Sequence, residues 1–238
     1  MSRKSKRIET IVSIDVLKDK LRPIQNSLDE LNLPEQAYQV VRHAIRELTL
    51  APGVMLLERE LANVLDMSRT PIREALVRLQ TEGLLTLVPR RGFAIAPIDK
   101  KDLEEIYEVA EVLDGLACEA AAKKVTSHDI NTLNQLLEEQ IKAISNSDVF
   151  TWAELDDKFH KYIAEIVGNR RLLQTIQSTE DHLYRARLYT VDKRPIPHQS
   201  VLEHRGIIIS MQIGDALAAR TLMQSHRKRA KTEIMQFL

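Results

Sequence analysis

Apolar residues recur at helical spacing through the first third of the chain. From Pro34 onward they return every three or four positions until Gly53, and Pro34 itself suits the first turn of a helix. A shorter apolar pattern covers residues 58–65, and a third runs from Ser68 to Gly83. These patterns predict three helices, the last two of which are joined by a tight turn.

The spacing changes after the third predicted helix. Two short β-like segments, at residues 84–88 and 92–96, flank a turn that contains Arg90 and Arg91. This arrangement predicts a hairpin with two arginines at its tip. Three helices and such a hairpin make up a winged helix-turn-helix, which we place at residues 32–98.

The rest of the chain has helical periodicity only. Asp99 begins a long amphipathic pattern. Further helices are expected at residues 127–146, 149–167, 170–189, 198–213 and 215–237. No segment here reads as a sheet, so residues 99–238 should form an all-helical bundle. The fold class is therefore mainly α, an N-terminal winged helix-turn-helix followed by a C-terminal all-α antiparallel helical bundle.

Residues 1–31 differ from both parts. They mix basic residues with a short helical pattern that Pro23 interrupts, and they lack a convincing apolar stripe. We therefore expect a mobile N-terminal arm.

Length and composition narrow the class of protein. A chain of 238 residues with 44% hydrophobic content can bury a core in each of two domains. The apolar stretches fall far short of the roughly 20 residues that span a bilayer, and no apolar segment follows the basic start. We expect a cytoplasmic protein with no membrane partner. Cys118 is the only cysteine, so a disulfide within the chain is excluded and a buried thiol is favoured.

The net charge of zero conceals an asymmetry. Residues 1–98 hold 15 Lys and Arg against 12 Asp and Glu, whereas residues 99–238 hold 19 against 22. A positive N-terminal part favours a polyanionic partner, and ordinary solvation of a helix face is the alternative.

The third predicted helix carries residues suited to reading DNA. In a helix-turn-helix the second helix of the pair enters the major groove with its N-terminal end first. Arg69, Thr70 and Arg73 lie at that end, and the arginine fork matches O6 and N7 of guanine. Arg90 and Arg91 at the hairpin tip are placed to reach phosphates or the minor groove.

Four residues of the second part form a candidate metal site. Asp156 and His160 are four apart, so one helix face presents both, while His204 and His226 fall on the last two predicted helices. One carboxylate and three imidazoles suit a divalent transition metal such as Zn(II) or Ni(II). Spacing alone leaves the alternative that these are ordinary surface or core side chains.

Two stretches of the N-terminal part resemble a known family. The sequences ERELANVLDMSRTPIREALVRLQTEGLL and PRRGFAI are similar to the DNA-binding domain of GntR-family regulators. The resemblance implies contacts to a double-stranded DNA operator from Arg59, Ser68, Arg69, Thr70, Arg73 and Gly92. Arg91 is added because it adjoins the glycine.

The C-terminal part resembles the FCD effector domain of the FadR-like branch of that family. The similar stretches are ELDDKFHKYIAEIVGN and LEHRGIIISMQIGDALAARTLMQSHR. Members with an Asp and three His at these positions bind a metal in the bundle, which implies this role for Asp156, His160, His204 and His226. The resemblance also implies a small organic acid as effector, and it argues against the acyl-CoA-binding members.

Two arginines are candidates for effector binding. Arg185 and Arg187 lie on the helix before Pro195, where family members often place a cation that faces the effector. They are two residues apart and cannot both face inward, and we favour Arg185 slightly. The family usually has an arginine and then a glutamate on the first effector-domain helix, where Ala110 and Asp114 stand here. An effector preference that depends on that arginine is therefore not carried over.

The combined reading is a transcriptional regulator with repression favoured, whose operator affinity responds to a small carboxylate bound at the metal site. One reading helix covers few base pairs, so we expect a homodimer on an inverted repeat. The alternatives are a metal-dependent enzyme domain fused to a DNA-binding domain and a purely architectural DNA-binding protein. The chain has no HExxH or GxSxG motif and no phosphate-binding loop, so it offers little for an enzyme.

Overall fold

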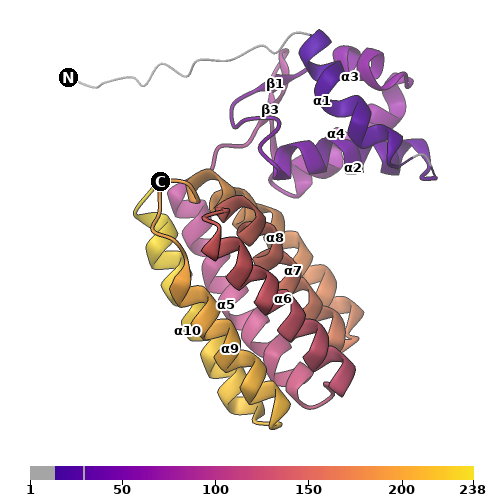
Figure 1. The fold of residues 1–238 in the computed structure, drawn as a ribbon. Helices are drawn as coiled ribbons and strands as arrows, with labels where there is room; N and C mark the ends of the chain where they lie inside the picture. The colour runs from indigo at the N-terminus through magenta and orange to yellow at the C-terminus, as the bar shows by residue number, and fades with distance from the viewer. Residues whose placement is uncertain (1–13, 29) are drawn as a thin grey trace. The chain divides into compact units, whose positions relative to one another are not determined.

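The structure is a computed structural model that describes residues 14–28 and 30–238 (Figure 1). The described residues form ten helices and three short strands, which makes the chain mainly α as the periodicity predicts. The chain divides into two compact units, and the boundary falls between Ile98 and Asp99.

The first unit is a winged helix-turn-helix. Its elements are α1 (Ile14–Asn26), α2 (Leu33–Arg46), β1 (Met55–Leu56), α3 (Glu58–Leu65), α4 (Arg69–Thr81), β2 (Leu85–Val88) and β3 (Gly92–Ile95). The strands form an antiparallel sheet in the order β1-β3-β2. The hairpin of β2 and β3 is the predicted wing. The sequence pattern does not predict β1, because a strand of two residues is too short to show alternation.

The packing of α4 decides which of its faces is open. Asp66 joins α3 to α4 with a φ of 54°, a left-handed conformation that aspartate adopts more readily than most residues. Ile72, Leu76 and Leu79 are buried in the core of the unit, as their helical spacing predicts. The other side of α4 is therefore left exposed.

The expectation of an N-terminal arm is wrong for residues 14–26. They form α1, in which Leu17 and Leu21 are fully buried and share a core with α2 and α3. Two leucines four residues apart are enough to pack a short helix against an existing core, although the helix contains Pro23 and its apolar stripe is narrow. The rest of the expected arm includes residues 1–13, which lie outside the described residues.

The second unit is a bundle of six helices. They are α5 (Lys100–Ala122), α6 (Ser127–Ser145), α7 (Val149–Val167), α8 (Arg170–Thr190), α9 (His198–Gln212) and α10 (Ala216–Met235). Five of them begin with a polar residue whose side chain accepts a hydrogen bond from a free backbone N–H, as N-cap residues do. These residues are Asp99, Thr126, Asp148, Asn169 and Asp215.

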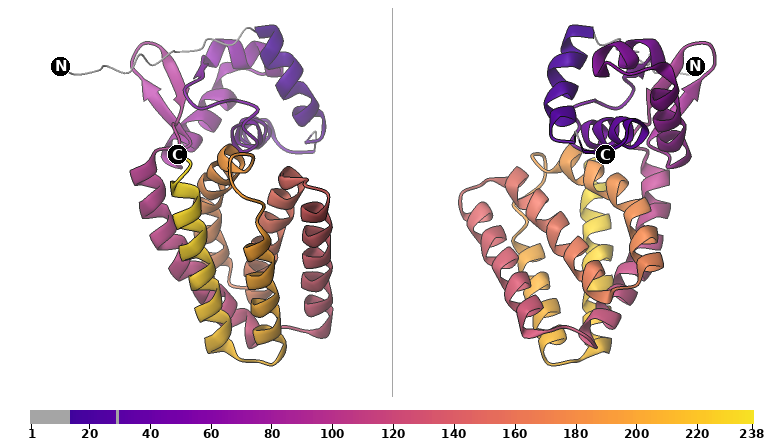
Figure 2. Two further views of the ribbon diagram at one scale, coloured as in Figure 1. Left: turned by 60° about the vertical axis from the view of Figure 1, so that its left-hand side comes forward. Right: turned by 90° about the vertical axis from the view of Figure 1, so that its right-hand side faces the viewer.

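The helices of the bundle surround a common interior (Figure 2). Helix α10 packs along α5 and against α9, α6 lies beside α7 and α9, and α5 also contacts α7 and α8. Cys118 on α5 is fully buried, which confirms the predicted buried thiol, and burial raises the pKa of its thiol. Every helix that the structure describes is too short or too polar to cross a membrane.

Candidate DNA-binding surface and metal centre

The start of α4 presents polar side chains to the outside. Arg69, Thr70 and Arg73 are exposed, and Arg59 on α3 is exposed as well. Ser68 is the N-cap residue of α4, but its side chain makes no capping hydrogen bond, so the hydroxyl is left for another partner. The residues predicted to read DNA therefore lie on the accessible side of the helix-turn-helix.

Glu58 at the start of α3 joins this surface. Its carboxylate lies 3.8 Å from Nη2 of Arg69 and 4.0 Å from Nε of Arg73. An acid between two arginines restricts where their guanidinium groups can point. Glu58 is not predicted from the sequence, because nothing in the spacing of α3 and α4 shows that the first turns of the two helices meet.

Packing of the wing explains why residue 92 is a glycine. Arg90 at the tip has a φ of 64°, and Arg91 is exposed beside it. Gly92 has a φ of 95°, and a Cβ atom there would lie 2.6 Å from the carbonyl oxygen of Leu56 on β1. Glycine is thus required for the pairing of β3 with β1, whatever it also does at the operator.

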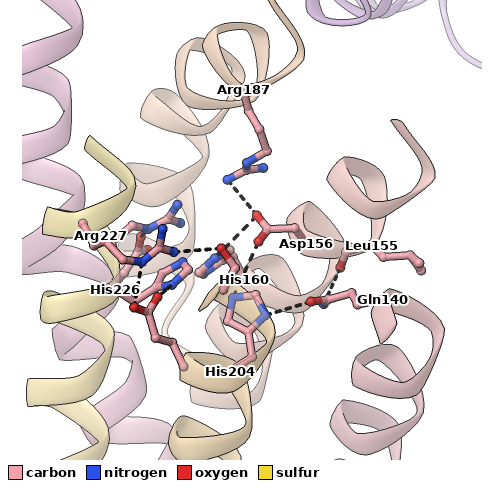
Figure 3. Close-up of polar contacts among 12 residues, drawn as sticks. Gln140, Leu155, Asp156, His160, Arg187, His204, His226 and Arg227 are labelled. Atoms are coloured by element: carbon pink, nitrogen blue, oxygen red, sulfur yellow. Dashed lines mark hydrogen bonds and ion pairs between the residues drawn. The ribbon is translucent and has the colours of Figure 1, made fainter. Parts of the chain in front are cut away.

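The four candidate metal ligands meet in the middle of the bundle (Figure 3). Asp156 and His160 come from α7, His204 from α9 and His226 from α10. All four are buried, and each offers a ligand atom within 4.8 Å of the others. The carboxylate of Asp156 lies 3.7 Å from Nε2 of His160 and 3.6 Å from Nε2 of His204.

The ionisation of the cluster suits a cation. Burial lowers the pKa of His160 well below its usual value, lowers that of His204 to about 3, and lowers that of His226. Burial alone would raise the pKa of Asp156, but the positive charge of Arg187, with a smaller contribution from Arg227, outweighs it and holds that pKa below its usual value. At neutral pH the cluster therefore holds a carboxylate and three imidazoles with free lone pairs.

Neighbouring side chains orient two of the imidazoles. Nδ1 of His204 lies 2.9 Å from Oε1 of Gln140, and Nδ1 of His226 lies 2.7 Å from Oε2 of Glu203. These oxygens only accept, so each Nδ1 carries the proton and each Nε2 is left with its lone pair. Nε2 of His204 and both ring nitrogens of His160 have no hydrogen-bond partner among the described residues. This donor set fits a divalent transition metal.

Arginines lie beside the cluster. Nη2 of Arg187 on α8 is 2.9 Å from Oδ2 of Asp156. Arg185 is buried as well, so the expectation that only one of the two arginines faces inward is wrong; the charge of Asp181 on its own helix acts on it. It is thus Arg187, and not the slightly favoured Arg185, that reaches the cluster. Arg227 on α10 is fully buried and donates from Nε to Asp114 on α5.

Helix α5 has Ala110 where the family usually has an arginine. Arg227 on α10 places a buried cation beside α5 instead, through its bond to Asp114. Arg227, Gln140 and Glu203 are absent from the residues that the sequence singles out. Gln140 had a signal, because it is a polar residue in line with the apolar positions Leu133 and Leu137 of α6. The sequence contains no such signal for Glu203 and Arg227. Each adjoins a candidate ligand in the sequence, but the direction of its side chain depends on how the helices pack.

Comparisons with known proteins agree with this architecture. The model of bacterial regulatory proteins of the gntR family matches residues 33–95, and the FCD domain model matches residues 105–229. The HTH-type transcriptional regulator YdhC of Bacillus subtilis is 32% identical over 195 residues, which cover 80% of this chain and 86% of YdhC. The HTH-type transcriptional repressor RspR of Escherichia coli is 26% identical over 202 residues, 85% of this chain and 89% of RspR.

A solved structure extends the likeness to the fold. E. coli McbR/YncC matches with a TM-score of 0.76 at 22% sequence identity, over 87% of this chain and 98% of that chain. The winged helix-turn-helix, the helical bundle and the two domain matches lead to one assignment. The chain belongs to the GntR family of bacterial transcriptional regulators and carries a C-terminal FCD domain.

Proposed function

We propose that this regulator is a repressor whose operator affinity is controlled by a small carboxylate metabolite bound at a divalent transition metal, zinc or nickel. The observation that carries the proposal is the buried cluster of four ligand atoms within 4.8 Å of one another. The name of RspR, a transcriptional repressor, supports repression over activation. The enzyme alternative is set aside, because the matching families and relatives are regulators.

The cluster supplies the metal ligands, and neighbouring side chains orient two of them. Asp156, His160, His204 and His226 would hold the metal, and Gln140 and Glu203 fix two of the imidazoles through Nδ1. When bound, the metal supplies a Lewis-acidic positive centre for a carboxylate oxygen. The protein's part is to keep the histidines neutral and to exclude competing water by burial.

The exposed arginines divide into two roles at the operator. We assign base reading to Arg69 and Arg73, which lie at the leading end of α4. We assign sequence-independent contacts to Arg90 and Arg91 at the wing tip. The other contacts proposed on the DNA side are Arg59, Ser68, Thr70 and the backbone at Gly92.

A homodimer on an inverted repeat is supported by an apolar face of α5. Val109, Val112 and Leu116 are spaced by three and four residues, and 49%, 53% and 45% of their surfaces are exposed. Large apolar side chains that share one helix face mark a surface for association. Pairing two copies through one symmetric patch would present two reading helices to a palindromic site.

Helix α5 also provides a route from the bundle to the wing. It begins at Lys100, five residues after β3 ends at Ile95, and it packs against α7, α8, α9 and α10. An effector changes DNA affinity only if it binds two arrangements of the protein with different affinity. We propose that the occupied cluster selects the position of α5, in a protein that works beside DNA in the cytoplasm.

Operator binding tests this function. Operators are selected from random double-stranded DNA, and fluorescence anisotropy then measures affinity with zinc or nickel and a panel of small carboxylates. We expect one or more acids to weaken wild-type binding by about 5- to 150-fold, the range of typical couplings. The His160→Ala, His204→Ala double variant should lose this response. An equal response in the double variant, or no response to any acid, would contradict the proposal.

A further inference from the structure

Three buried arginines of the bundle carry unused hydrogen-bond donors, and two of them, Arg187 and Arg227, border the candidate metal centre. The side chains of Arg187, Arg194 and Arg227 are 6%, 5% and 1% exposed. Within the described part of the chain, Nη1 of Arg187, Nε and Nη2 of Arg194, and Nη1 and Nη2 of Arg227 have no hydrogen-bond partner. A guanidinium group stays charged in proteins, so these donors are buried cationic groups in need of an acceptor.

The three arginines come from different parts of the bundle. Arg187 lies on α8, Arg194 lies between α8 and α9, and Arg227 lies on α10. All three act electrostatically on the fully buried phenol of Tyr107 on α5, as does Asp156. Arg187 and Arg227 both border the cluster and reach it from different helices (Figure 3).

Each arginine already pairs with a carboxylate, but the pairing leaves some of its N–H donors without an acceptor. Arg187 pairs with Asp156 at 2.9 Å, and Arg194 donates from Nη1 to Glu233 at 2.7 Å. Glu233 is shared with Arg229 at 2.6 Å, so it does not serve Arg194 alone.

Arg227 likewise keeps donors beyond its partners. It bonds to Asp114 through Nε only, and Nη2 lies 4.0 Å from Glu180. Burial, together with the neighbouring carboxylates of Asp157 and Asp114, raises the pKa of Glu180 to about 8, so at pH 7 this acid compensates the charge of Arg227 only in part. A buried donor without an acceptor is costly, which favours an anion at this place.

We infer that the effector is a dicarboxylic acid, whose second carboxylate binds to the unused donors of Arg187, Arg194 and Arg227. The inference rests on the proposed function, because the first carboxylate is the one assigned to the metal. Planar guanidinium groups match a carboxylate in a way that a point charge does not. The arginine set therefore selects acids with a second negative group over acids that end in a methyl group.

Matched pairs of acids test this selection. Isothermal titration calorimetry on zinc-loaded, full-length protein compares malonate with propionate, succinate with butyrate, and glutarate with valerate. Within each pair a carboxylate replaces a methyl group. At least one dicarboxylate should bind about tenfold more tightly than its partner, which corresponds to about 1.4 kcal/mol.

The variant series separates this role from a structural one. Arg194→Gln should reduce the preference to less than about threefold and leave monocarboxylate affinity unchanged, since the charge-assisted bonds to the second carboxylate are lost. Arg194→Lys keeps the charge and should restore part of the preference, and it decides the matter if the glutamine variant fails to fold. Arg220→Gln, on the outside of α10, is the matched control and should behave as wild type.

Three results would overturn the inference. They are equal affinity within every pair, a preference that survives both Arg194 variants, and an equal loss for both acids of a pair in Arg194→Gln. Elemental analysis of the same samples keeps the two proposals apart. Bound metal and monocarboxylate binding without a dicarboxylate preference would overturn only this inference, whereas protein that takes up no metal would overturn the proposed function as well.

Discussion

Arg187 and Asp156 form a buried ion pair inside the candidate metal centre, with Nη2 of the arginine 2.9 Å from Oδ2 of the aspartate. The same carboxylate approaches His160 and His204 at 3.7 and 3.6 Å. Asp156 is therefore both the counter-ion of Arg187 and a candidate ligand. A bound cation would share the negative charge for which Arg187 is now the nearest counter-ion.

Replacing Arg187 should be more harmful without metal than with it. Arg187→Gln removes the nearest counter-charge of the buried Asp156 carboxylate, and breaking a buried ion pair in this way typically costs about 3–5 kcal/mol in the free energy of unfolding. Zinc would supply a new counter-charge, so the loss should be clearly smaller in the loaded protein. Urea unfolding with zinc and with a chelator measures both values, and Arg220→Gln serves as the exposed control. Equal losses under the two conditions would contradict the assignment of Asp156 as a ligand.

The arginines of α4 and of the wing should respond differently to substitution. Arg69→Ala or Arg73→Ala should cost about 1–3 kcal/mol per base contact and relax operator specificity. Arg90→Ala or Arg91→Ala should weaken binding to all DNA sequences more evenly and reduce its salt dependence. Anisotropy titrations of specific and random DNA over a range of salt concentrations distinguish the two classes. Unchanged operator affinity in both α4 variants would show that the reading helix is assigned wrongly.

The apolar face of α5 should hold two copies together. Val112→Glu places a charge in the middle of this face, so we expect it to produce monomers and to weaken binding to an inverted repeat. Phe150→Glu, at an equally exposed position on α7, is the matched control and should leave the assembly intact. Analytical ultracentrifugation reports the mass directly. A wild-type monomer, or a dimer that survives Val112→Glu, would exclude this face as the interface.

Helix α1 should contribute to the stability of the DNA-binding unit. Leu17→Ala or Leu21→Ala removes a fully buried side chain and should cost about 2–5 kcal/mol in the free energy of unfolding. Val16→Ala, on the outer side of the same helix, should change it by less than about 0.5 kcal/mol. Chemical unfolding followed by circular dichroism measures the difference. Leucine variants as stable as the control would restore the interpretation of this segment as an arm.

The sequence predicted the larger elements well because their signals are local and long. Six helices of the bundle follow apolar periodicity over 15 or more residues, and their starts are marked by capping side chains such as Asp99 and Thr126. Helix α1 and strand β1 were not predicted, because their signals are short. Helix α1 buries only a narrow apolar stripe and β1 has two residues, so only tertiary packing shows that Leu17 and Leu56 belong to the core.

The candidate site was predictable to the extent that its residues share a helix or a family pattern. Asp156 and His160 stand one turn apart, and the structure brings His204 and His226 to them. The residues that complete the surroundings come from helices distant in sequence, as the bond from Arg227 to Asp114 shows. Such pairings depend on how α5 and α10 pack, which no spacing in a single sequence reveals.

The metal content of the protein tests the central claim most directly. Elemental analysis is applied to wild type and to the His160→Ala, His204→Ala double variant, both purified without chelator and then offered Zn(II) or Ni(II). The account predicts one divalent transition metal per wild-type chain and little in the variant, which loses two of its four ligands. No metal in the wild type, or equal amounts in both proteins, would contradict it and leave only the DNA-binding assignment in place.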